Sequence, residues 1–135
     1  MASVTPITAG QHYTESRLAV LNEQIYAYKH GIRPLVLQTM AVEDKADIEK
    51  RLQRDKLTYH ITETPKGNSL NVFFGDKPCV DVVKSFGKTP LYKLSPEKDF
   101  ILGIMLGYDK TKQCERYLKM KDKEAAQQKK LDVVA

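Results

Sequence analysis

The side chain with the clearest potential for covalent chemistry is Cys79, which follows Pro78 near the start of an expected helix. The N-terminus of a helix lowers the pKa of a nearby thiol, and Lys77 would act in the same direction. A thiol-dependent enzyme would also need a neighbouring base or a resolving cysteine, and the sequence places neither beside Cys79. The other cysteine, Cys114, falls on the packed side of a helical pattern. We therefore favour a packing role for Cys79 and keep a reactive thiol as the alternative.

Three further candidates lie on one face of an expected β-hairpin between residues 57 and 75. Two segments, one on either side of a Pro-Lys-Gly-Asn turn, have an apolar residue at every second position, which predicts two antiparallel strands. The side chains of His60, Asn71 and Phe73 would project from the face opposite the more apolar one. A phenylalanine on a wholly wetted face would expose a large apolar group. This face is therefore a candidate binding site or dimer interface, with a solvated sheet surface as the alternative.

Arg33 and Lys66 are candidate anion-binding residues. Arg33 precedes Pro34 and has the planar guanidinium that suits carboxylates and phosphates. Lys66 lies in the hairpin turn, where backbone N–H groups could receive an anion beside it, although turn geometry alone also explains the segment. The tripeptide at 87–89, Gly-Lys-Thr, copies the end of a phosphate-binding loop. We reject that interpretation because the motif needs glycine where Val82 stands, and because the tripeptide ends a helix rather than beginning one.

The histidines do not indicate a metal site. His12, His30 and His60 have no ligand spacing with one another or with either cysteine. The acidic residues between 43 and 49 form a charged helix face, whereas acid–base catalysis would require carboxylates that face each other. We therefore expect no metal and no cofactor, and we favour a non-enzymatic protein.

The charge of the chain is modest and unevenly distributed. The formal net charge of the 135 residues is +5. Residues 109–135 hold eight lysines and arginines against five acidic residues, a net charge of +3, and the first 108 residues hold fourteen against twelve, a net charge of +2. A basic end favours an acidic partner. Because acidic residues are interleaved among the basic ones and aromatic residues are sparse there, the pattern argues against nucleic acid as that partner.

The sequence also predicts the compartment. The first ten residues, MASVTPITAG, show no basic segment followed by an apolar one, and the longest apolar run, 100–106, is far shorter than the roughly 20 residues of a membrane span. Two cysteines are too few for a disulfide scaffold. We expect a cytoplasmic protein without membrane contact.

The elements that must position these residues belong to an α+β fold. We expect a three-stranded sheet that contains the hairpin at about 57–75 and an earlier strand at about 35–40, and we favour a mixed sheet in which the first two strands are parallel. About five helices should pack on it, at about 14–30, 43–56, 76–86, 96–106 and from Asp109 onwards. The expected N-caps are Thr14, Asp76, Ser95 and Asp109, and the glycines expected to end helices are Gly31, Gly87 and Gly107. In the first two helices the expected apolar positions are Leu18, Leu21, Ile25, Tyr28, Ile48 and Leu52, and Asp47 and Arg51 are spaced for an i,i+4 pair. Residues 1–13 read as a loose leader, 14–120 as one domain, and 121–135 as a polar helical extension or frayed tail.

Several segments resemble a small family of uncharacterised bacterial proteins. The resemblance covers roughly residues 16–120, and the segments that carry it are Gly31-Ile32-Arg33-Pro34-Leu35, Thr64-Pro65-Lys66-Gly67-Asn68, Asn71-Val72-Phe73-Phe74-Gly75 and the run from Asp99 to Tyr108. It implies an α+β fold of about three strands and five helices and suggests a homodimer. It implies no activity and no catalytic residues.

The leading functional hypothesis is a homodimeric binding or adaptor protein with an acidic protein partner, for instance a small redox carrier such as a flavodoxin. Phe73 and the apolar helix at 96–106 offer more apolar surface than one small domain readily buries, which favours the dimer. One alternative is a nucleic-acid-binding protein that uses its basic C-terminal helix. The other is the thiol-dependent enzyme built on Cys79.

Overall fold

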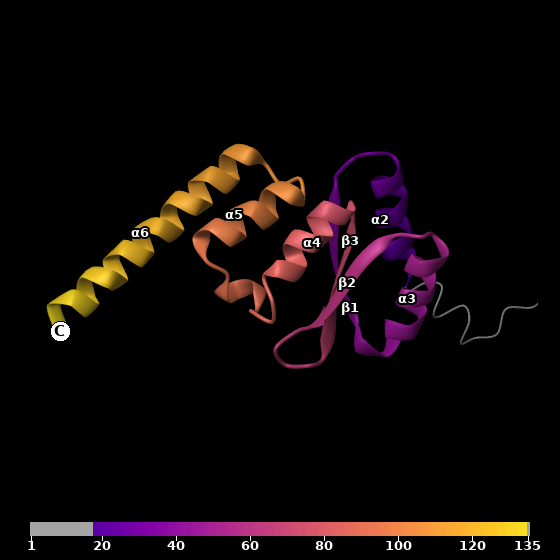
Figure 1. Ribbon diagram of the computed structural model, residues 1–135, viewed down its shortest axis with the longest axis horizontal. Helices are drawn as coiled ribbons and strands as arrows, with labels where there is room; N and C mark the ends of the chain where they lie inside the picture. Colours follow the sequence, from indigo (N-terminus) through magenta and orange to yellow (C-terminus); the bar gives the residue numbers. More distant parts are fainter. Residues whose placement is uncertain (1–17, 135) are drawn as a thin grey trace, which may run out of the picture.

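A three-stranded antiparallel sheet forms the centre of the computed structural model, which describes residues 18–134. The expected leader at 1–13 and Thr14, the expected cap of the first helix, lie outside the described residues. The strands are β1 (Leu35–Ala41), β2 (Thr58–Glu63) and β3 (Ser69–Gly75). Five α-helices accompany them in the described part, which confirms the α+β class and the expected hairpin. Figure 1 shows helices on both sides of the sheet.

The strand order β1–β3–β2 corrects the expectation of a mixed sheet. Strands β1 and β2 do run in the same direction, but β3 lies between them and pairs antiparallel with both. The tight turn places β3 beside β2, and β1 then occupies the other side of β3. This central place suits β3 because large apolar side chains project from both of its faces, namely Val72 and Phe74 on one and Phe73 on the other.

Two helices cover one face of the sheet. They are α2 (Ala19–Lys29) and α3 (Lys45–Arg54), which follows the short 3₁₀ helix Val42–Asp44. Four of their expected apolar positions are buried in one core with the sheet, and Leu18 and Tyr28 are partly buried against it. The buried residues of this core are Leu21, Ile25, Ile48, Leu52, Val36, Met40, Leu70, Val72 and Phe74. The expected pair between Asp47 and Arg51 is wrong, because the Arg51 guanidinium donates instead to Asp55 at 3.2 Å.

The opposite face carries α4 (Lys77–Ser85), and α5 (Pro96–Met105) packs beyond it. A 3₁₀ helix, Leu91–Lys93, lies between these two helices in the chain. The core on this side contains Leu35, Phe73, Val80, Val83, Phe86, Leu94, Leu102 and Leu106. Phe73 is only 1% exposed. Phe73 therefore leaves no apolar surface for a partner copy, contrary to the expectation from the sequence, because α4 and the segment after it already cover this ring.

The last helix, α6 (Lys110–Val134), pairs with α5 and then extends beyond the rest of the molecule (Figure 1). The expected caps are present: Ser95 Oγ accepts a bond from the Lys98 backbone N–H at 3.3 Å, and Asp109 Oδ1 accepts one from that of Lys112 at 2.8 Å. Gly103 is buried where α5 meets the side chain of Gln113, so its missing side chain serves contact between α5 and α6. None of the helices in the described range is long and apolar enough to cross a membrane.

Candidate binding site

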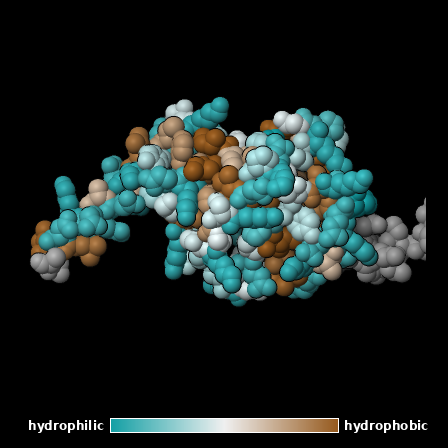
Figure 2. Space-filling model, in the orientation of Figure 1, coloured by the Kyte–Doolittle hydropathy of each residue, from teal (hydrophilic) through white to brown (hydrophobic). Residues whose placement is uncertain are grey.

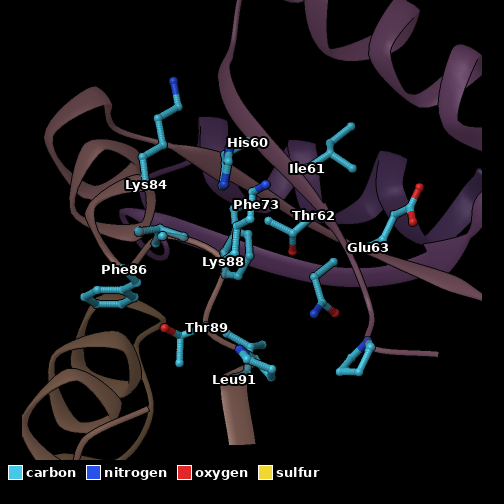
Figure 3. A pocket seen from close by; sticks show the side chains of 15 residues that line it. His60, Ile61, Thr62, Glu63, Phe73, Lys84, Phe86, Lys88, Thr89 and Leu91 are labelled. Carbon is cyan, nitrogen blue, oxygen red and sulfur yellow. The ribbon is translucent and has the colours of Figure 1, made fainter. Parts of the chain in front are cut away.

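A cavity of about 640 Å³ opens between the distal half of the hairpin and the segment where α4 ends. Figure 3 shows side chains from these two parts of the chain facing each other. The hairpin contributes His60, Ile61, Thr62, Glu63, Pro65, Asn71 and Phe73, and the other wall consists of Val83, Lys84 and residues 86–91. The cavity therefore joins two segments that are separated by a helix in the sequence.

The strand register explains why these hairpin residues meet. His60 and Phe73 are direct cross-strand partners, and so are Thr62 and Asn71. On the second face of the sheet these pairs form two successive rows, one aromatic and one polar. Helix α4 ends at Ser85, and Gly87, with φ of +69°, turns the chain away. The cavity therefore opens over the polar row and the edge of the aromatic one.

His60 is the titratable group whose pKa the cavity changes most clearly. Its ring lies 6.5 Å from that of Phe73 between centroids, with 27° between the planes. Burial lowers the pKa of His60 below its ordinary value, and the positive charge of Lys84 lowers it further. The imidazole is therefore neutral at pH 7 and offers one donor and one acceptor.

The side-chain amide of Asn71 is held in place by β1, the strand that pairs with β3 on the side away from β2. The Thr39 hydroxyl donates to Asn71 Oδ1 at 3.1 Å. That bond uses the carbonyl oxygen, and no described side chain or backbone group accepts from the Asn71 amide nitrogen. Since Asn71 lines the cavity, this nitrogen is a donor suited to an acceptor group on a bound molecule.

Two lysines and one glutamate set the charge around the cavity. Lys84 and Lys88 are exposed and lie on the wall formed by α4 and its following loop. Glu63 is on the hairpin wall. Phe86 is an apolar residue of the wall formed by the end of α4, and the Lys98 ammonium lies over its ring, 5.8 Å from the centroid. The site combines an apolar interior with a net positive rim.

The structure brings together three of the predicted site residues and separates the others. His60, Asn71 and Phe73 line the cavity, whereas Arg33 and Lys66 do not. Arg33 lies near Gly107, at the junction of α5 and α6. Lys66 is exposed in the hairpin turn.

Cys79 belongs to a different, shallower hollow, of about 480 Å³, at the start of α4. Asp76 occupies the expected N-cap position, but its carboxylate accepts a bond from the Tyr28 hydroxyl at 2.7 Å instead of capping the helix. Burial raises the pKa of the Cys79 thiol, and the nearby Asp76 carboxylate raises it further. This direction is opposite to the one on which the thiol-enzyme alternative depends.

Sequence reasoning missed the wall formed by Lys84, Phe86, Lys88 and Leu91. The Gly-Lys-Thr tripeptide at 87–89, which resembles the end of a phosphate-binding loop, was the one sequence feature that pointed to this segment. Its rejection as such a loop agrees with the structure, since Gly87 follows the end of α4. Local sequence could not indicate that this loop faces the hairpin.

The described residues contain no cluster of three His, Cys, Asp or Glu side chains that could hold a metal ion. The comparison with curated proteins finds no match. Residues 19–120 match the family described as protein of unknown function, DUF2023, which confirms the resemblance to a family without an assigned function. This matched segment includes the whole sheet, the cavity and the α5–α6 junction. The chain therefore belongs to the DUF2023 family.

Proposed function

We propose that the protein is a non-enzymatic cytoplasmic binding module that receives an acidic protein partner at the cavity between the hairpin and α4. The single observation that carries the proposal is the combination of a largely apolar cavity with Lys84 and Lys88 on its wall. Such a site buries an apolar side chain while the two ammonium groups attract neighbouring carboxylates. The neutral His60 and the amide nitrogen of Asn71 add hydrogen-bonding groups inside it.

An extended segment of a protein suits this site because the cavity runs along an edge strand. Strand β2 pairs with β3 on one side, and no described strand pairs with its other side. Residues 60–63 of β2 all line the cavity. A partner segment that added to this edge would form backbone hydrogen bonds and could direct alternate side chains into the cavity.

A flavodoxin is the partner to test first, because it is a small acidic redox carrier. We expect isothermal titration of the purified protein with a purified flavodoxin to show binding at low salt that weakens as salt is added. Thr62→Trp should block the cavity, and Lys84→Gln with Lys88→Gln should weaken binding by about tenfold, or 1.4 kcal/mol.

The matched control is Lys110→Gln with Lys129→Gln, which removes the same charge from α6. If both lysine pairs lowered the affinity equally, net charge rather than the cavity would explain the binding. Absence of heat at low salt would remove flavodoxin as the partner. Unimpaired binding by the Thr62→Trp variant would place the contact elsewhere.

We also propose a homodimer, which rests on the apolar helix α5 and its neighbour α6 and no longer on Phe73. An apolar hollow of about 600 Å³ there is lined by Phe100, Ile101, Cys114, Tyr117 and Leu118, with Glu97 at its side. Ile101 is 43% exposed and Leu118 is 59% exposed. Figure 2 shows apolar side chains on the visible surface near the junction of these two helices. A second copy of the chain could bury this surface.

Cys114 makes the dimer directly testable because it is exposed in that hollow. We expect a short thiol-specific crosslinker to join two Cys79→Ser chains through Cys114, and Leu118→Glu to abolish the crosslink. Sedimentation should show a dimer that the same Leu118 substitution converts to a monomer. A strict monomer in the unsubstituted protein would contradict this part of the proposal.

A further inference from the structure

Five basic residues form a stripe along one side of α6, with a gap of two turns between Lys123 and Lys130. At about 100° per residue, Lys112, Arg116, Lys119, Lys123 and Lys130 fall within roughly 60° of one another around the helix axis. The same geometry makes the stripe about 27 Å long, at about 1.5 Å per residue. All five residues are exposed.

The acidic residues of α6 lie outside this stripe. Around the same axis, Glu115 and Asp122 fall to one side, Glu124 to the other side, and Asp132 on the far face. In the linear sequence these residues interrupt the basic ones, which argued against a nucleic-acid partner. The continuous helix places all four acidic residues off the stripe and removes that objection.

The structure leaves most of the stripe available to a partner. Arg116 is engaged in a two-bond pair with Asp99 of α5, at 2.8 and 3.0 Å, yet its side chain remains 58% exposed. No described acidic side chain forms an ion pair with the other four. The second half of α6 projects past α5 in Figure 1, and hydrophilic side chains cover most of its visible surface in Figure 2.

We propose that this basic stripe binds the phosphate backbone of double-stranded nucleic acid. Phosphate backbones are bound largely by cations, whereas the centres of protein interfaces are depleted of charge and enriched in aromatic residues. No aromatic residue lies on the stripe to stack an unpaired base, so a duplex fits better than a single strand. An isolated exposed helix also has the dimensions to enter the major groove of DNA.

A membrane surface fits this helix less well. An interfacial helix places a row of large apolar side chains opposite its basic ones. Opposite the stripe, α6 carries Cys114, Tyr117 and Leu118 only in its first half, beside α5, whereas its projecting half carries Lys121, Gln128 and Asp132 there. This inference is independent of the cavity proposal, because the two sites share no residue.

Fluorescence anisotropy with a labelled DNA duplex tests the proposal through its salt dependence. Four or five phosphate contacts predict that log K falls with log salt at a slope of about −4, which is roughly a 250-fold loss over a fourfold rise in salt. Lys119→Gln with Lys123→Gln should weaken binding and bring the slope to about −2. Glutamine preserves helix propensity, so circular dichroism should be unchanged.

The control variant Lys110→Gln with Lys129→Gln removes the same charge from positions off the stripe and should retain nearly the whole slope. Equal effects of the two double variants would overturn the stripe, because net charge alone would then account for binding. Absence of an anisotropy change at low salt would overturn the proposal as well. Displacement of the duplex by an equal charge concentration of polyglutamate would assign the stripe to an acidic protein instead.

Discussion

His60 and Lys84 line the same cavity, where the positive charge of Lys84 disfavours a positive charge on His60. Burial and the Lys84 ammonium both hold the pKa of His60 below 6.5. We expect Lys84→Gln to raise the His60 pKa towards 6.5 without reaching it, because the effect of burial remains. NMR titration of the imidazole resonances would measure this change. Lys88→Gln is the control, and equal shifts in both variants would show that Lys84 has no specific role.

The lowered His60 pKa also has a consequence for stability. The folded state binds the imidazole proton less tightly than the unfolded state does, so this group contributes its full stability above about pH 6.5. The contribution is lost as the pH falls from 6.5 through the folded-state pKa. A ligand carboxylate in the cavity would raise the pKa again, so acidic ligands should bind more tightly as the pH falls.

Tyr28 shows the opposite shift at the sheet end near α4. Burial and the hydrogen bond to Asp76 raise the pKa of Tyr28 to about 12. Its contribution to stability is therefore complete below about pH 10 and is lost as the pH rises towards 12. We expect Tyr28→Phe to lower the free energy of unfolding by about 1 kcal/mol at pH 7, and by less above pH 10. Urea unfolding would measure both values.

Tyr26→Phe is the matched control for that experiment, because Tyr26 is 65% exposed on the same helix. Its substitution should change stability little at either pH. A constant difference between Tyr28→Phe and the unsubstituted protein from pH 7 to pH 12 would contradict the role of the Tyr28 hydroxyl.

At the scale of elements, Gly75 determines how closely β3 approaches the start of β1. Its φ is +153°, and a Cβ atom there would collide with the backbone of Pro34 and lie 2.9 Å from Leu35 Cα. We expect Gly75→Ala to cost more than Gly67→Ala, which should cost about 1–2 kcal/mol because its φ of +70° is strained but its surroundings are open. Equilibrium unfolding of the two variants would compare these costs, and equal values would contradict the close approach.

At the scale of the whole molecule, the projecting half of α6 should contribute little to folding. Residues 122–133 are exposed, whereas Lys121 still bonds to Glu97 of α5 at 3.0 Å. We therefore expect truncation after Lys121 to shift the melting temperature by no more than about 2 °C, since the surface ion pairs it removes are weak. Thermal unfolding followed by circular dichroism would test this, and a much larger loss would mean that this segment packs against something, such as a second copy.

The local signals in the sequence anticipated most elements correctly. Ser95 and Asp109 cap helices, and the glycines that were expected to end helices at 31, 87 and 107 all have positive φ. The failures were long-range. Asp76 bonds to Tyr28, 48 residues earlier, and Asp55, which pairs with Arg51 on its own helix, also pairs with Lys29 of α2. Such choices depend on contacts between elements that no local pattern encodes.

The sequence by itself determined the elements of this protein and the face on which His60, Asn71 and Phe73 lie, because helix caps, turns and strand alternation are local properties. Only the tertiary structure decided that α4 covers Phe73 and leaves a cavity over Asn71. It also decided that β3 separates β1 from β2. The structure further shows that α6 continues as one helix, which places five of its eight basic residues on one side. The physical reason is that burial and strand order depend on residues far apart in the chain, which meet only when the hydrogen-bonded elements pack together.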